Sequence, residues 1–211
     1  IRDRYKMKKT IICSISMKEN IDQVVYSSKD KSLPVSERKV RYPICAFLEK
    51  TMESDDELEV IILVKKDKKD YYKRNIAFFK EELEAVNKEI GAAIEYKIID
   101  SEFEEHQTVH EQLLKDIVAQ ISDDSHIYVD ITYGPKDLPI ILFTTLSFAE
   151  KFLNCTVENI VYGQADFENG RAVNTRICDM VPLYCLSSIT NTIECTDSDK
   201  ARSMLNLLLT F

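Results

Sequence analysis

The feature of this sequence that most constrains its fold is a regular alternation between short apolar runs and segments with helical periodicity. β-Branched and aromatic residues dominate the runs, whereas apolar residues recur every three to four positions between them. We predict strands over residues 10–16, 58–64, 94–99, 126–131, 157–162 and 172–178. We predict helices over residues 42–52, 71–90, 104–121, 138–152, 182–193 and 197–209, the last capped by Asp197 or Ser198.

This alternation predicts an α/β, Rossmann-like fold with a mostly parallel six-stranded sheet and helices on both faces. Connections between parallel strands are right-handed, and 3-2-1-4-5-6 is the commonest strand order in such a sheet. In that order the strand at 10–16 lies beside the strand at 126–131. The loops that leave their carboxyl ends then flank the point at which such sheets bind ligands.

The stretch 126–139, HIYVDITYGPKDLP, joins a buried strand to a turn and a helix start. Residues 132–136 supply a hydroxyl, an aromatic ring, a flexible glycine, a proline that opens a helix, and a cation. A glycine turn before a helix N-terminus favours an anion, because free N–H groups and the positive end of the helix dipole converge there. On spacing alone, a purely structural turn with Pro135 in the first helical turn is an equal alternative.

Charge and cysteine usage narrow the class of protein. The net charge of −8 opposes general binding of long nucleic acid, which needs a basic surface, but is compatible with a nucleotide in a local pocket. The six cysteines form no C-x-x-C pair and no zinc spacing, which indicates reduced, mostly buried thiols in a cytoplasmic protein. We expect no metal and no cofactor.

The chain divides into three parts in this interpretation. Residues 1–9 are a basic lead, added for expression or flanking a membrane helix on its cytoplasmic side; residues 10–193 are the ligand-binding domain; residues 194–211 form a C-terminal helix that packs on the same domain or on a partner subunit. Residues 17–38 are polar and aperiodic, which predicts a functional or mobile loop. No stretch is long and apolar enough to span a bilayer.

Three segments carry a resemblance to a known family. Asp130-Ile131-Thr132-Tyr133-Gly134-Pro135-Lys136 resembles the D-x-T-H-G-x-R/K motif of CARF domains, the Rossmann-like sensors of type III CRISPR systems. Residues 160–163, IVYG, resemble their I-x-Y-G strand end, and residues 179–193 resemble the helix after their last core strand. Tyr133 stands where the family commonly has histidine, and Lys136 where it commonly has arginine.

The resemblance implies a sensor in antiviral defence that binds a cyclic oligoadenylate, cyclic tetra-adenylate foremost, across a homodimer that can assemble further. Backbone N–H groups and Lys136 would meet phosphates, hydroxyls would hold ribose or base edges, and Tyr133 would stack on adenine. The expected ligand-binding residues are Ser14, Ile15, Ser16, Met17, Thr132, Tyr133, Gly134, Pro135 and Lys136. The signal would pass to an effector part outside this chain, for example an N-terminal transmembrane helix.

Other interpretations stay open. The resemblance also allows a ring nuclease in which Lys136 stabilises the charge that develops as the ring is cleaved, although we assign no catalytic residue. An ordinary Rossmann-type nucleotide enzyme is disfavoured, because the first strand is not followed by G-x-G-x-x-G. Ser14 and Ser16 have a structural alternative at a strand end, and Tyr133 has one under the helix. Asp130 more simply caps or orders the turn than performs acid–base work.

Overall fold

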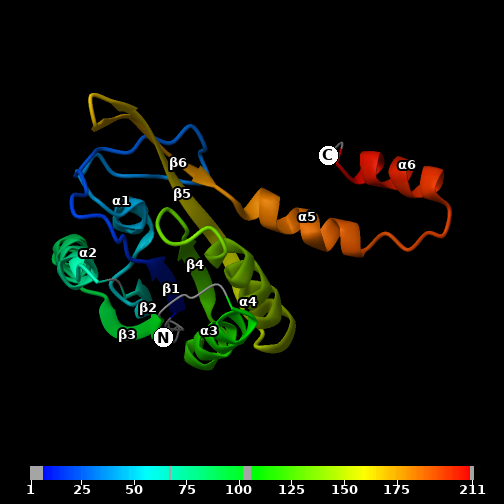
Figure 1. The fold of residues 1–211 in the computed structure, drawn as a ribbon, viewed down its shortest axis with the longest axis horizontal. Helices are drawn as coiled ribbons and strands as arrows, with labels where there is room; N and C mark the ends of the chain where they lie inside the picture. Colours follow the sequence, from blue (N-terminus) through cyan, green and yellow to red (C-terminus); the bar gives the residue numbers. More distant parts are fainter. Residues whose placement is uncertain (1–6, 67, 102–105, 210–211) are drawn as a thin grey trace, which may run out of the picture. The chain divides into compact units, whose positions relative to one another are not determined.

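The computed structural model describes residues 7–66, 68–101 and 106–209 (Figure 1). The predicted start of a helix at 104, and residues 1–6 of the basic lead, lie outside these ranges. Strands and helices alternate in the order β1 Lys8–Ser14, α1 Pro43–Thr51, β2 Glu57–Lys65, α2 Tyr71–Asn87, β3 Ala93–Ser101, α3 Gln107–Gln120, β4 His126–Asp130, α4 Leu138–Phe152, β5 Thr156–Glu168, β6 Arg171–Asp179, α5 Val181–Asn191 and α6 Ser198–Leu208.

The six strands form one sheet in the order β3-β2-β1-β4-β5-β6. The first five are parallel, and β6 pairs antiparallel with β5. The predicted fold class and strand order are therefore confirmed. The order reverses between β1 and β4, so the loops that leave these two strands lie side by side.

The hairpin of β5 and β6 is longer than the sequence pattern indicates. β5 continues past the predicted end at 162 as far as Glu168, where Asn169 and Gly170 close a two-residue turn with φ angles of 50° and 77°. Left-handed angles at both positions are what a type I′ hairpin turn requires. The outer half of this hairpin extends beyond the other strands (Figure 1).

Hydrophobic side chains pack on both faces of the sheet. Alternate residues of a strand point to opposite faces, so Ile11 and Ile62 pack with α1 and α2, whereas Ile12 and Ile61 point to the face that α3 and α4 cover (Figure 1). All four are fully buried. Large apolar helix side chains that are at most 2% exposed include Ile44, Phe47, Leu48, Phe79, Leu83, Leu113, Ile117, Leu142 and Leu146.

The long segment between β1 and α1 is held against the domain. Val24 and Val40 form an antiparallel bridge, and Ser27 bridges to Arg176 of β6. Leu33 and Val40 are fully buried. The segment predicted as a functional or mobile loop is thus anchored to the core at a few positions, while most of its residues are exposed.

The chain forms two compact units, one ending at Asp179 and the other comprising α5 and α6 from Met180. Asp197 caps α6, since its carboxylate accepts hydrogen bonds from the N–H groups of Asp199 and Lys200. This resolves the sequence alternative between Asp197 and Ser198. Within the described ranges, no helix combines the length and apolar character that crossing a membrane requires.

Candidate functional site

The turn after β4 is organised by Asp130, whose side chain is 1% exposed. Its two carboxylate oxygens accept hydrogen bonds from the N–H groups of Thr132, at 2.8 Å, and of Ile44 in the first turn of α1, at 3.2 Å. Burial raises the pKa of the Asp130 carboxyl above its ordinary value, and the hydrogen bonds oppose that change. Asp130 therefore orders the turn and caps α1, as the sequence favoured.

Thr132 ties the turn to the end of the sheet. Its Oγ1 accepts a hydrogen bond of 2.9 Å from the N–H of Gly163 in β5. A Cβ atom at Gly163 would lie 2.5 Å from Cγ of Pro43, so only glycine lets α1 approach this closely. The Thr132 side chain also hydrogen-bonds the Asp130 carboxylate, so its hydroxyl is engaged on both sides.

Gly134 brings the β4 turn against the end of β1. Its φ angle is +113°, and a Cβ atom there would lie 2.7 Å from Oγ of Ser14 and 2.8 Å from Cδ2 of Leu138. Both the backbone angle and the space require glycine. In the described part of the chain, the backbone N–H groups of Tyr133, Gly134 and Lys136 find no acceptor, so they can meet an anion.

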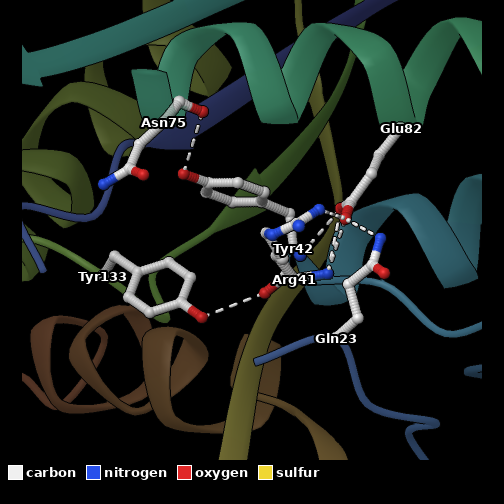
Figure 2. A network of polar contacts seen from close by, with 6 residues as sticks. All are labelled: Gln23, Arg41, Tyr42, Asn75, Glu82 and Tyr133. Atoms are coloured by element: carbon white, nitrogen blue, oxygen red, sulfur yellow. Dashed lines mark hydrogen bonds and ion pairs between the residues drawn. The ribbon is translucent and has the colours of Figure 1, made fainter. Parts of the chain in front are cut away.

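Tyr133 belongs to a polar network that joins the turn after β4, the segment before α1, and helix α2 (Figure 2). Its hydroxyl donates to the carbonyl oxygen of Arg41 at 3.0 Å, and its ring packs edge-on against Tyr42 with centroids 5.4 Å apart. Burial raises the pKa of the Tyr133 hydroxyl, so it stays protonated and donates. The ring therefore packs against the core with its hydroxyl engaged, while one side of the residue still faces a cavity.

Helix α2 supplies the anchors of this network (Figure 2). The Glu82 carboxylate is buried and accepts hydrogen bonds from the N–H groups of Arg41 and Tyr42, from the Arg41 guanidinium and from Gln23. Asn75 is fully buried and lies on the same face of the helix as Glu82. Its amide group donates hydrogen bonds to the carbonyl oxygens of Ser16 and Lys18. Helix α2 thus holds the loop after β1 directly, and it holds the turn after β4 through Arg41, whose carbonyl oxygen accepts from Tyr133.

A cavity of about 850 Å³ opens beside these loops at the carboxyl ends of β1, β4 and β5. This volume lies within the range of about 300–1,000 Å³ that is usual for small-molecule sites. The lining residues are Ser16, Met17, Lys18, Asn20, Ile21, Asp22, Val24, Tyr26, Thr132, Tyr133, Gly134, Tyr162, Gly163, Gln164, Ala165, Asp166, Phe167, Gly170, Ala172 and Arg176.

Five of the nine predicted ligand-binding residues line this cavity: Ser16, Met17, Thr132, Tyr133 and Gly134. The other four do not. Ser14 and Ile15 are buried at 4% and 1% exposure, Pro135 is half-buried, and Lys136 is exposed. No ion pair links Lys136 to any described residue, so its charge is available beside the turn.

The outer wall of the cavity comes from the β5–β6 hairpin. The sequence predicted two strands here with a turn at residues 166–170, but none of these residues was assigned to the site. Gln164, Phe167 and Arg176 line it, and the ammonium of Lys18, from the loop after β1, lies over the Phe167 ring at 5.5 Å from its centroid. The Asn169-Gly170 pair was the available signal, because such a pair between β-type residues marks a hairpin turn.

Across the described residues, no group of acidic, histidine or cysteine side chains is arranged to hold a metal.

The fold and the site together define an α/β, Rossmann-like protein with a ligand-sized cavity at its topological switch point. No protein-family model matches the chain. Over 77 residues, 36% of this chain, the sequence is 29% identical to CRISPR-associated protein MJ1674 of Methanocaldococcus jannaschii. The match spans 12% of that protein's length. The similarity supports a link to CRISPR-associated proteins.

Proposed function

We propose that this chain is the sensor domain of a type III CRISPR antiviral effector and binds cyclic tetra-adenylate across a homodimer. The observation that carries the proposal is the cavity beside the Thr132-to-Lys136 turn, where the motif resembling CARF domains lies at the switch point of a Rossmann-like sheet. The similarity to a CRISPR-associated protein supports the same assignment. An effector part outside this chain would receive the signal.

The turn has the chemistry that a phosphate needs. Three backbone N–H groups without acceptors, of Tyr133, Gly134 and Lys136, lie in the turn that precedes α4, and the exposed Lys136 ammonium belongs to the same segment. The rigid placement by Asp130, Thr132 and Gly134 means that little ordering is required on binding. A phosphodiester would therefore lie at the rim, over the turn.

The cavity itself suits the nucleoside part of the ligand better than a second phosphate. Its charged side chains are two cations, Lys18 and Arg176, and two carboxylates, Asp22 and Asp166, which cancel in sum. Neutral cavities with mixed donors and acceptors favour groups that carry both, as ribose and adenine do. A two-fold ring of four adenylates would present two nucleosides to each subunit.

Isothermal titration calorimetry with cyclic tetra-adenylate, cyclic hexa-adenylate and linear tetra-adenylate tests the proposal. We expect one cyclic tetra-adenylate per two chains, with weaker binding for Lys136→Ala and unchanged binding for Lys115→Ala, an exposed lysine on α3. Chromatography of the ligand after the titration shows whether the ring is intact. Failure of both rings to bind at micromolar concentrations would overturn the proposal.

A further inference from the structure

The outer wall of the cavity contains a pair of polar side chains with a fixed mutual geometry. Gln164 of β5 and Arg176 of β6 lie opposite each other in the hairpin register. The Arg176 Nε donates a hydrogen bond of 2.8 Å to Oε1 of Gln164. Both residues line the cavity, where Arg176 is exposed and Gln164 is half-buried.

This hydrogen bond decides which way the Gln164 amide faces. Oε1 is directed to Arg176, so the Nε2 amino group is directed away from it. Among the described residues, no acceptor is found for Nε2, and Oε1 keeps a second lone pair. The amide thus offers one donor and one acceptor side by side.

A donor beside an acceptor is the pattern that recognises adenine. A glutamine amide pairs with adenine by donating to N7 and accepting from the N6 amino group, whereas guanine and hypoxanthine place an oxygen at position 6. That oxygen would face Oε1, acceptor against acceptor. The Phe167 ring, 63% exposed on the same wall, adds an apolar surface on which a base can stack.

We infer that Gln164 is the residue that selects adenine in this cavity, and that Arg176 is a positioning residue that holds its amide in the selecting orientation. The inference rests on the proposed function. It adds the residues that select the base, and these belong to the β5–β6 hairpin rather than to the Thr132-to-Lys136 turn.

The competing explanation is structural. Residues paired across an antiparallel hairpin stabilise it, and a Gln–Arg pair at an exposed site can serve that purpose alone. In that case the replacement of Gln164 would lower hairpin stability without changing which base is preferred. Base preference therefore separates the two explanations, while affinity alone does not.

The test compares three ring ligands by calorimetry: cyclic tetra-adenylate, the same ring with inosine in place of adenosine, and the same ring with 7-deazaadenosine. For the native protein we expect the two altered rings to bind at least about tenfold more weakly, in line with the discrimination of a bidentate contact. Gln164→Leu is expected to weaken the adenine ring and to abolish the preference. Gln107→Leu, an exposed glutamine on α3, is the matched control.

Two further variants isolate the other residues. Arg176→Leu is expected to reduce the preference and Arg176→Lys to restore part of it, because a lysine can still donate to Oε1. Phe167→Leu is expected to weaken the adenine and inosine rings equally, since stacking does not distinguish the group at position 6.

The outcomes also separate this inference from the proposed function. Tight binding with equal affinity for adenine and inosine rings, or a preference that survives Gln164→Leu, overturns the assignment of Gln164 and leaves the sensor function standing. Binding of no ring at all overturns the sensor function and this assignment with it.

Discussion

The carboxylate of Asp130, the last residue of β4, accepts a hydrogen bond from the backbone N–H of Ile44 in α1 across 86 positions of sequence. The same carboxylate holds the N–H of Thr132, the first residue of the turn that begins the site. One buried side chain therefore fixes the orientation of α1 and the shape of the turn together. Its replacement tests both.

Asp130→Asn is expected to lower the free energy of unfolding by about 1–3 kcal/mol, because an amide group cannot accept from both N–H groups and leaves one buried donor unpaired. Urea unfolding followed by circular dichroism measures this loss. Asp123→Asn, at an exposed position before β4, is the control and is expected to change little. An equal effect of the two substitutions would contradict the capping role.

The pKa of Asp130 also predicts a pH dependence. Burial raises this pKa above 3.8, so the folded state favours the protonated carboxyl relative to the unfolded chain. The stabilisation that follows is complete below pH 3.8 and is lost as the pH rises through the raised pKa. The difference in unfolding free energy between the native protein and Asp130→Asn should thus fall as the pH rises from 3.8 through the raised pKa. An increase of this difference over the same pH range would contradict the raised pKa.

Gly134→Ala tests the contact between the two loops of the site. We expect it to cost about 1–3 kcal/mol more than Gly170→Ala, because a Cβ at Gly134 collides with Ser14 and Leu138, whereas Gly170 has open space. Both glycines have positive φ angles, so backbone strain affects both variants. Thermal unfolding measures the difference. Equal melting temperatures would mean that the loops can separate freely.

Glu82→Gln tests the anchoring of the site by α2. The substitution removes charge-assisted hydrogen bonds to Arg41 and is expected to cost about 1.5–3 kcal/mol. Glu81→Gln, the exposed neighbour on the same helix, is the control. Because the Arg41 carbonyl holds the Tyr133 hydroxyl, tyrosine fluorescence should change in Glu82→Gln as well. If Glu82→Gln had the fluorescence spectrum and the unfolding free energy of the native protein, Glu82 would not anchor the network.

The cysteines are expected to differ strongly in reactivity. Cys13 and Cys45 are fully buried, and burial, with Asp130 and other nearby acidic groups, raises the pKa of both thiols. Because the thiolate is the reactive form, a thiol reagent should modify Cys178, Cys185 and Cys195 first and these two only on unfolding. Mass spectrometry of the labelled peptides follows each site. Early labelling of Cys13 in the native protein would contradict the buried arrangement.

The sequence by itself determined the order of the sheet and the meeting of its two loops. Apolar periodicity reports which face of each element is buried, and right-handed connections then leave few ways to arrange six strands. Gly134 and Ser14 could be placed together on this basis, and they do meet. The cap of α6 was narrowed to Asp197 or Ser198 in the same way, because capping depends on neighbouring residues, and the structure selects Asp197.

Only the tertiary structure decided which side chains face the cavity. Tyr133 donates its hydroxyl hydrogen bond to a carbonyl oxygen 92 positions away, and Arg41 pairs with Glu82. The orientation of these side chains depends on hydrogen-bond partners that are remote in sequence, and the periodicity of apolar residues does not predict such partners. Gln164 and Arg176 reach the site because β5 and β6 extend past the other strands as a hairpin. The Asn169-Gly170 pair marks its turn locally, but the packing that makes the hairpin a wall of the cavity depends on residues remote in sequence.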